Sequence, residues 1–251
     1  MSFQFGHRPS IFNLLISLRD TIKSKNFYKI ERNLGSICDT LKSLQVSTIL
    51  EIGTGYTPFD SIYLRHRLGP VCITTVDRNH LLTIRLPILA LSFFPSTYSV
   101  LSLNQLLNLF LYGTSYLRSS LDISYLSPSN YLPDGHYNAC FSNAVLEHLS
   151  LAEIDMLIHQ LSLRNVKYIL GIYDHNDHSC RHAEPSSHFL EHTSSDHDNQ
   201  VKGNSIHPSA LVTVFSKYGY LLSYYPKSLS GSLSRVYDFF AYRTSASSPF
   251  L

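Results

Sequence analysis

The sequence predicts one α/β domain built on a doubly wound, mostly parallel sheet. An apolar strand ends in a glycine-rich turn at residues 51–55, and a helix-compatible segment and a second apolar strand follow it. This order describes a βαβ unit. Further apolar runs alternate with amphipathic segments to the end of the chain, as a doubly wound sheet requires. With 44% hydrophobic residues, the 251 residues can bury one sizeable core, so we expect residues 1–251 to form a single domain.

Residues 1–45 are expected to form helices that precede the sheet. Their apolar residues recur at helical spacing in two groups. The groups are Ile11, Leu14, Leu15 and Leu18, then Leu34, Ile37, Leu41 and Leu44. The first apolar run is short, and Arg19 and Asp20 follow it without a small-residue cleavage site. We therefore expect a helix there and not a signal peptide.

The first βαβ unit follows these helices. Its first strand, Val46 to Ile52, is apolar and rich in β-branched residues, and Asp60 to Leu68 is compatible with a helix. A break at Gly69-Pro70 then precedes a second apolar strand, Val71 to Val76, with Asp77 at its carboxyl end. Strand, glycine turn, helix and strand are therefore expected in this order.

An apolar helical insertion or lid is expected at residues 80–120. Its central part, Leu86 to Leu117, contains no charged residue. Pro87, Pro95 and several amide side chains interrupt it, so no window of about 20 residues is continuously apolar, as a membrane-spanning helix requires. We expect two buried or lid-forming helices that break near Pro95, no transmembrane segment, and leave peripheral membrane contact open.

The second half of the chain continues the alternation of strands and helices. The expected strands are 121–126, 137–142, 166–173, 221–225 and 237–242. The expected helices are Leu151 to Leu163 and a last helix that His207-Pro208-Ser209 begins and that runs to Tyr218. The polar, histidine-rich segment 174–207 is long for a plain connection, so we expect a functional loop there.

Charge and cysteine content exclude several classes of protein. Lys and Arg number 20 and Asp and Glu 18, a net charge of +2, which is too balanced for a nucleic-acid binder. A small-molecule partner fits better. The four cysteines are Cys38, Cys72, Cys140 and Cys180. They form no CxxC pair, which argues against a zinc site or a disulfide scaffold and favours a reducing, cytoplasmic location. The oligomeric state is left open.

The run Glu51-Ile52-Gly53-Thr54-Gly55 and Asp77 form the candidate cofactor site. A glycine turn lets a ligand approach the backbone, and an acid at the end of the next strand can accept hydrogen bonds from a ribose diol. A dinucleotide site would need a small residue at position 58, where the chain has Pro58, so a nicotinamide-dependent oxidoreductase fits less well. Glu51 suits a cofactor that carries an ammonium group. A purely structural turn is the plain alternative.

Two motifs resemble the class I S-adenosylmethionine-dependent methyltransferases. The first is TILEIGTG at 48–55, and the second is LPDGHYNACFSNAVLEH at 132–148, which is similar to the block around the family's fourth strand. The likeness covers residues 46–175 and extends loosely to FSKYGY at 215–220. One residue departs from the family pattern, because Asn138 replaces the usual acid before the fourth strand. We expect this departure to weaken a structural contact.

The resemblance implies a Rossmann-like methyltransferase sheet with S-adenosyl-L-methionine as its cofactor. Glu51, Gly53 and Gly55 would surround the methionine part, and Asp77 would bind the ribose hydroxyls. The segment from Ser127 to Asn130 would lie near the adenine, and Ser142 and Asn143 near the sulfonium.

Candidate bases follow the fourth and fifth strands. Methyl transfer from a sulfonium needs alignment and, for a hydroxyl acceptor, removal of a proton. His148 and His175 have a suitable side chain for this step, although His148 suits local packing at a helix start equally well. The other histidines and the acids of 174–207 could bind a divalent metal, but no HxxxH lies on a clear helix, so no metal is expected.

We expect an enzyme that transfers a methyl group to an oxygen of a small-molecule, sugar or lipid-like acceptor held beneath residues 86–117. The alternative is a non-catalytic cofactor- or metal-binding protein that retains the fold.

Overall fold

A seven-stranded sheet with the strand order β3-β2-β1-β4-β5-β7-β6 runs through the computed structural model. The structure describes residues 27–54, 59–77, 103–126, 132–174, 206–226 and 236–244. Strands β1 to β5 are parallel, whereas β7 runs antiparallel to both β5 and β6. The expected doubly wound, mostly parallel sheet is therefore confirmed.

The strands begin and end within a few residues of the expected positions. They are β1 (Thr48–Ile52), β2 (Cys72–Val76), β3 (Ile123–Leu126), β4 (Ala139–Asn143), β5 (Tyr168–Asp174), β6 (Tyr220–Pro226) and β7 (Val236–Arg243). The described helices are α2 (Phe27–Ser43), α3 (Phe59–Leu68), α5 (Leu103–Tyr112), α6 (Thr114–Leu121), the 3₁₀ turn η1 (Leu146–His148), α7 (Leu151–Leu163) and α8 (Pro208–Lys217).

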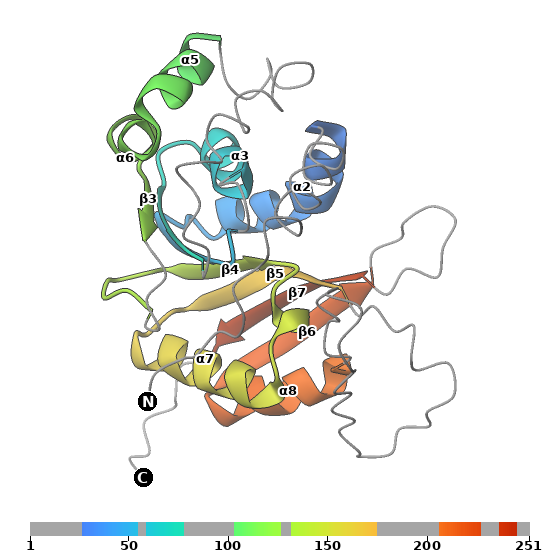
Figure 1. Ribbon diagram of the computed structural model, residues 1–251. Helices are drawn as coiled ribbons and strands as arrows, with labels where there is room; N and C mark the ends of the chain where they lie inside the picture. Colours follow the sequence, from blue (N-terminus) through green and yellow to red (C-terminus); the bar gives the residue numbers. More distant parts are fainter. Residues whose placement is uncertain are drawn as a thin grey trace, which may run out of the picture.

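Helices cover both faces of the sheet. Helices α2 and α3 lie on one side, and α7 and α8 lie on the other (Figure 1). Strand residues alternate between the two cores, as the strand period of two requires. Ile49 and Phe141 pack with α2 and α3, whereas Leu50 and Cys140 pack with α7 and α8.

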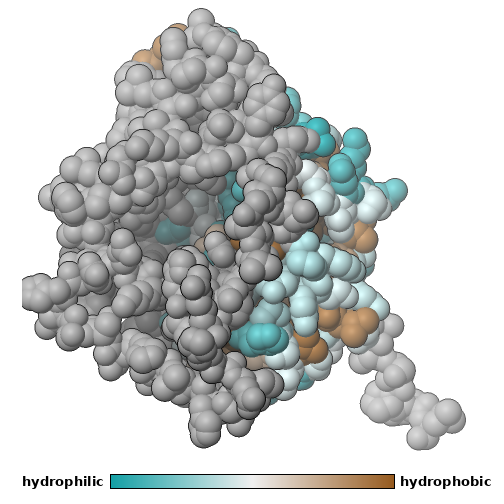
Figure 2. Space-filling model, turned by 90° about the vertical axis from the view of Figure 1, so that its right-hand side faces the viewer, coloured by the Kyte–Doolittle hydropathy of each residue, from teal (hydrophilic) through white to brown (hydrophobic). Residues whose placement is uncertain are grey.

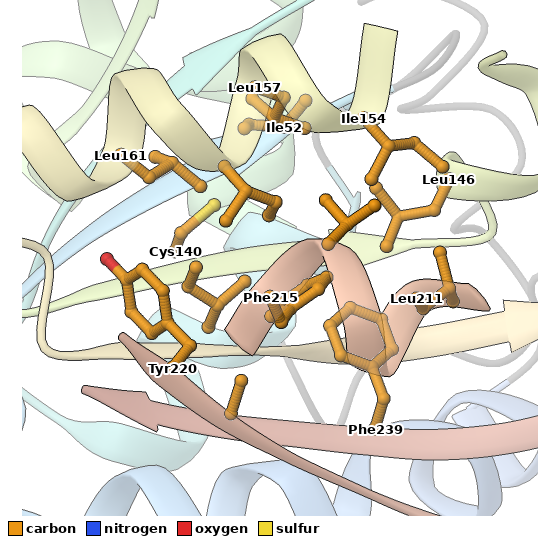
Figure 3. Packing of buried hydrophobic residues seen from close by; sticks show 14 of the residues in the cluster. Ile52, Cys140, Leu146, Ile154, Leu157, Leu161, Leu211, Phe215, Tyr220 and Phe239 are labelled. Atoms are coloured by element: carbon orange, nitrogen blue, oxygen red, sulfur yellow. The ribbon is translucent and has the colours of Figure 1, made fainter. Parts of the chain in front are cut away.

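The core beneath α7 and α8 combines aliphatic and aromatic side chains. Phe215 of α8 makes edge-to-face contacts with Tyr220 of β6 and Phe239 of β7, and all three lie in the packed cluster of Figure 3. A fully buried side chain of this size stabilises the fold by about 1.5–3 kcal/mol. Leu211 and Ile154 extend the same cluster toward the start of the two helices.

Local interactions and backbone conformation determine where helix α7 begins and ends. Ser150 caps its N-terminus, because the Ser150 side chain accepts from the Glu153 amide while Glu153 accepts from the Ser150 amide. This is a reciprocal capping box. At the other end, Arg164 and Asn165 leave the helix, and Asn165 adopts a left-handed φ of 54°.

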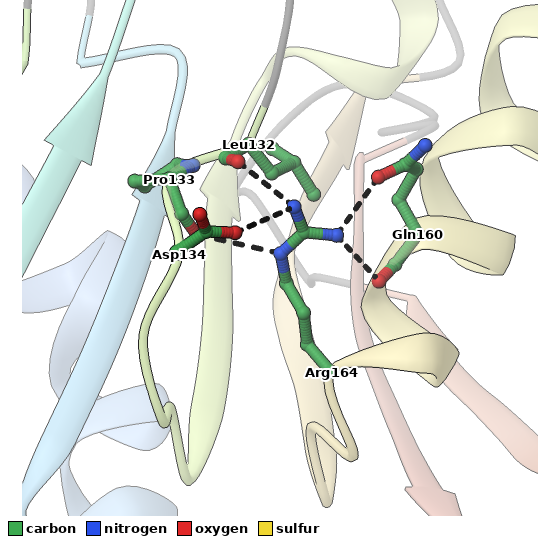
Figure 4. A network of polar contacts seen from close by, with 5 residues as sticks. All are labelled: Leu132, Pro133, Asp134, Gln160 and Arg164. Carbon is green, nitrogen blue, oxygen red and sulfur yellow. Dashed lines mark hydrogen bonds and ion pairs between the residues drawn. The ribbon is translucent and has the colours of Figure 1, made fainter.

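Arg164 ties the end of α7 to the segment that precedes β4. Its guanidinium donates to the carbonyl oxygens of Leu132 at 2.9 Å and Pro133 at 3.3 Å. It also donates to the side-chain oxygen of Gln160 at 2.8 Å (Figure 4). The nearby Asp134 carboxylate is fully exposed and 3.8 Å away, so it contributes little. Arg164 therefore acts mainly through backbone carbonyls.

Asn138 joins the starts of β1 and β4 through its side-chain oxygen. Its Oδ1 accepts from the amide nitrogens of Ser47 at 3.0 Å and Thr48 at 3.1 Å. It also accepts from the hydroxyls of Ser47 at 2.8 Å and Thr48 at 3.1 Å. An amide oxygen here meets the same donors as a carboxylate would, so the contact between the starts of β1 and β4 is kept.

The N-terminal and insertion helices are described in part. In α2 the buried residues Leu34, Ile37 and Leu41 confirm the expected apolar face, while the first expected helix lies outside the described residues. Helices α5 and α6 meet at Gly113, whose φ is 55°, and the expected break at Pro95 also lies outside them.

The described surface mixes polar and apolar side chains. Figure 2 shows hydrophobic residues in small groups among hydrophilic ones on the described part of one face. On α5 the side chains of Leu107, Leu111 and Tyr112 are more than half exposed. Among the described helices, none combines the length and the apolarity that crossing a membrane requires.

Candidate functional site

The carboxyl ends of β2, β1 and β4 bring four of the expected site residues, Gly53, Asp77, Ser142 and Asn143, to one edge of the sheet. Ile52 pairs with Val76 on one side and with Ser142 on the other. One residue further along, Gly53 follows β1 between Asp77 and Asn143. The Gly53 amide donates to the Val76 carbonyl at 2.8 Å, which holds the start of the turn against β2.

Position 53 requires glycine for two reasons, the backbone conformation and the close contact with Val145. Its φ of 76° lies in the left-handed region, which glycine adopts without steric cost. A β-carbon at this position would lie 2.2 Å from Cγ2 of Val145. On this side Gly53 therefore makes room for a side chain that follows β4, so part of its role is internal packing.

Three carboxylates lie buried near this edge. Glu51 is 1% exposed, Asp60 6% and Asp77 7%. The Ser61 hydroxyl, from the first half of α3, donates to Glu51. The negative charge of these carboxylates favours a ligand that brings hydrogen-bond donors or positive charge to this edge.

Asn143 and Asp60 connect β4 to the first turn of α3. The Asn143 side-chain amide donates to Oδ2 of Asp60 at 2.6 Å. Asp60 lies where α3 begins, a position at which the helix dipole favours a negative charge.

Two buried hydroxyls offer hydrogen-bonding capacity in the same region. Thr54 follows Gly53 and is 7% exposed, and Ser142 is 2% exposed. Neither hydroxyl oxygen has a hydrogen-bond partner in the part of the chain that the structure describes. Buried polar groups are rarely left without a partner, so each is a candidate contact for a ligand or a water molecule.

The two β4 residues expected near the sulfonium lie on opposite faces of the sheet. Asn143 reaches Asp60 on the α3 side. Ser142 is level with Ile52 and Gly171, and Ile52 belongs to the core under α7 and α8. A β-carbon at Gly171 would lie 1.7 Å from the Ser142 carbonyl oxygen, so glycine at 171 allows the two backbones to approach closely.

Several expected site residues lie outside the described part. These are Gly55, Ser127 and His175. His148 ends η1, and only its backbone is described. For all four, the assigned roles stay predictions.

The ends of the histidine-rich segment are nevertheless located. It follows Asp174 at the end of β5, and the chain is described again from Ile206. The Tyr173 hydroxyl donates to the Ile206 carbonyl, so the two ends of the segment are tied together beside β5. In the described ranges, no three His, Cys, Asp or Glu side chains form a group that could hold a metal ion, and most of residues 174–207 lies outside those ranges.

Sequence reasoning missed Asp60 and Ser61, and it gave Thr54 no role of its own within the glycine turn. An acid in the first turn of a helix has an ordinary explanation in the helix dipole, so Asp60 gave no distinctive signal. Its contact with Asn143 joins residues 83 positions apart, and no local pattern reports such a pairing.

Comparison by sequence finds no match: no family profile fits the chain, and no curated protein sequence matches it. Comparison by structure finds similar proteins. The chain superposes on the methyltransferase domain of bacterial CtHen1 with a TM-score of 0.54 and 16% identity, covering 84% of this chain and 98% of that one. It superposes on magnesium protoporphyrin IX methyltransferase from Synechocystis PCC 6803, solved with bound SAH, with a TM-score of 0.52 and 9% identity over 96% of this chain and 90% of that one.

A third structure is the S-adenosylmethionine-dependent methyltransferase SibL. The TM-score is 0.55 and the identity 13%, and the match covers 97% of this chain but 64% of that one. These likenesses show that the chain has the fold of the class I S-adenosylmethionine-dependent methyltransferases.

Proposed function

We propose that this chain binds S-adenosyl-L-methionine and transfers its methyl group to a small-molecule acceptor. The observation that carries the proposal is the juxtaposition, at the carboxyl ends of β1 and β2, of the Gly53 turn and the buried Asp77. Open α/β sheets bind their ligands at this edge. Solved methyltransferases share the fold.

The described residues fit this cofactor. Asp77 can accept hydrogen bonds from a ribose diol, and the Thr54 hydroxyl has unused hydrogen-bonding capacity. The cofactor's ammonium and sulfonium are both cationic, so the buried Glu51 and Asp77 carboxylates favour them. A dinucleotide would bring phosphates toward the same carboxylates, which disfavours NAD.

When bound, the sulfonium supplies an electrophilic methyl group, and the protein's task is alignment. A hydroxyl acceptor must also lose a proton, and a histidine has a suitable pKa for accepting it. His175 comes directly after Asp174, the last residue of β5, in the sequence, and we assign it the role of base, with His148 as the second candidate. The hydrogen bond from Tyr173 to Ile206 ties the described residues on either side of this segment together beside β5.

We further propose an oxygen of a small, sugar or lipid-like molecule as the methyl acceptor, with residues 86–102, the part of the expected cover before α5, held over it. The charge-free composition of that segment supports this proposal. The described helices α5 and α6 contribute Gln105 and Leu121 to a hollow beside Arg65 and Gly69, at the C-terminal end of α3. They thus lie away from Gly53, and a role as lid belongs to the remainder of the insertion.

Calorimetry and a transfer assay test the proposal together. S-adenosylmethionine and S-adenosylhomocysteine should bind at micromolar affinity while NAD gives no heat. Radiolabelled methyl from the cofactor should then enter a deproteinised small-molecule extract, and chelator should leave the rate unchanged. No heat with either sulfur compound would reject the proposal. Binding without turnover on the true acceptor would favour the non-catalytic alternative.

A further inference from the structure

Asp60 holds the side chain of Asn143 in one orientation. The Asn143 nitrogen Nδ2 lies 2.6 Å from Oδ2 of Asp60. An ionised carboxylate can only accept hydrogen bonds, so the amide must present its NH₂ group to Asp60. The amide oxygen of Asn143 is then directed away from Asp60.

That oxygen is an available acceptor at the candidate site. Asn143 is half-buried, and none of the described residues donates a hydrogen bond to its Oδ1. Asn143 lies at the end of β4 beside Gly53, on the side of the sheet that carries Glu51 and Asp60. A ligand group that suits this place carries N–H donors and a positive charge.

We infer that Asp60 is a positioning residue, which fixes Asn143 so that its amide oxygen accepts a hydrogen bond from the ammonium group of the bound cofactor. The inference rests on the proposed function. An ammonium fits better than a neutral hydroxyl because it is both a donor and a cation on the side of the sheet that carries the buried Glu51 carboxylate. Without Asp60, the Asn143 amide could turn and present its NH₂ group to the ammonium. Both groups are hydrogen-bond donors, so they would repel each other.

The inference makes Asp60 act through Asn143 and not by its own charge. Asp60→Asn replaces the acceptor-only carboxylate with an amide that can donate or accept, so the orientation of Asn143 is no longer fixed. Asn143→Ala removes the contact while it leaves the Asp60 carboxylate in place. If Asp60 acts only through Asn143, the double variant should lose no more affinity than either single one.

Calorimetry on four proteins tests this, with S-adenosylhomocysteine and 5′-methylthioadenosine, which lacks the amino-acid part, as probes. The proteins are the wild type, Asp60→Asn, Asn143→Ala and the double variant, with Asp134→Asn as a control at a fully exposed carboxylate. Each single variant and the double variant should bind S-adenosylhomocysteine about tenfold more weakly, the effect of one hydrogen bond to a charged group. Binding of 5′-methylthioadenosine should stay within about twofold, which also shows that the site is folded.

Three results would overturn the inference. One is unchanged S-adenosylhomocysteine affinity in Asn143→Ala, and another is a loss of about a hundredfold in the double variant, which means independent effects. The third is an equal loss for both probes, which indicates a structural role. A wild type that binds neither probe rejects the proposed function itself, and the inference with it.

Discussion

Val145 lies against the open side of Gly53, so close that a β-carbon on residue 53 would be 2.2 Å from its Cγ2 atom. The turn after β1 and the segment after β4 are therefore packed together at the edge where the site forms. Gly53 also has a φ of 76°, so two separate costs oppose any side chain there.

Gly53→Ala should destabilise the fold through both costs. The left-handed backbone costs about 1–2 kcal/mol for a residue with a β-carbon, and overpacking against Val145 adds about 1–3 kcal/mol. In a Val145→Ala background the backbone cost should remain and most of the packing cost should disappear, because the Cβ of residue 145 lies 3.2 Å away. Urea unfolding of the four combinations measures this difference, and an equal loss from Gly53→Ala in both backgrounds would contradict the packing argument.

Asp77→Ala should weaken binding of S-adenosylmethionine by about 1–3 kcal/mol, the effect of removing the partner of buried hydroxyls. Asp77 is 7% exposed and follows β2 beside Gly53, so its carboxylate is well placed for a ribose. Calorimetry on the folded variant measures the change, with Asp134→Ala as the exposed control. Unchanged affinity would show that the ribose contact lies elsewhere.

His175→Ala should lower methyl transfer by about 10²–10⁴-fold if His175 is the base. A base that acts only on the acceptor's proton leaves the ground-state affinity for the methyl donor within about threefold. Initial rates with the true acceptor and calorimetry with S-adenosylhomocysteine separate the two effects. Full activity in the variant would mean that His148 is the base, or that catalysis depends on alignment of the substrates alone.

The sequence predicts the positions of the strands in the parallel half well, because each buried strand is an apolar run bounded by glycine, proline or a polar turn. It also predicts α7, whose Ser150 and Glu153 form a capping box. The strand period of two places the neighbours Ser142 and Asn143 on opposite faces, but the sequence alone does not show that Asn143 is the one on the α3 side. The burial of Asp60 likewise depends on packing between α3 and β4, which no local pattern encodes.

Asn138→Asp should stabilise the protein at neutral pH by about 1 kcal/mol, because charge-assisted hydrogen bonds are stronger than neutral ones. All four contacts of the Asn138 side chain are accepted by Oδ1. Asn138→Ala leaves donors of Ser47 and Thr48 without this acceptor and should destabilise by about 1–3 kcal/mol. Thermal unfolding of the three proteins checks the order. An Asn138→Asp variant that is less stable than the wild type at pH 7 would contradict this reasoning.

Tyr220 should make stability fall at high pH. Burial of its side chain raises the pKa of the phenol to about 12 from 10.0, although Arg243 opposes part of this shift. Its hydroxyl donates to the Val166 carbonyl at 2.7 Å, and ionisation would lose that donor. The neutral phenol is therefore favoured in the folded state. Its contribution is complete below pH 10, where the unfolded chain also keeps the proton, and is lost as pH rises from 10 to about 12.

Urea unfolding across this pH range measures the effect, with Tyr220→Phe as the test and Tyr225→Phe as the control, since Tyr225 is 61% exposed. The wild type and the Tyr225 variant should lose stability together above pH 10. Tyr220→Phe should start about 1–2 kcal/mol lower, because the Val166 carbonyl loses its donor, and should then show a shallower decline. Parallel declines in all three proteins would show that Tyr220 ionises as freely in the folded chain as in the unfolded one.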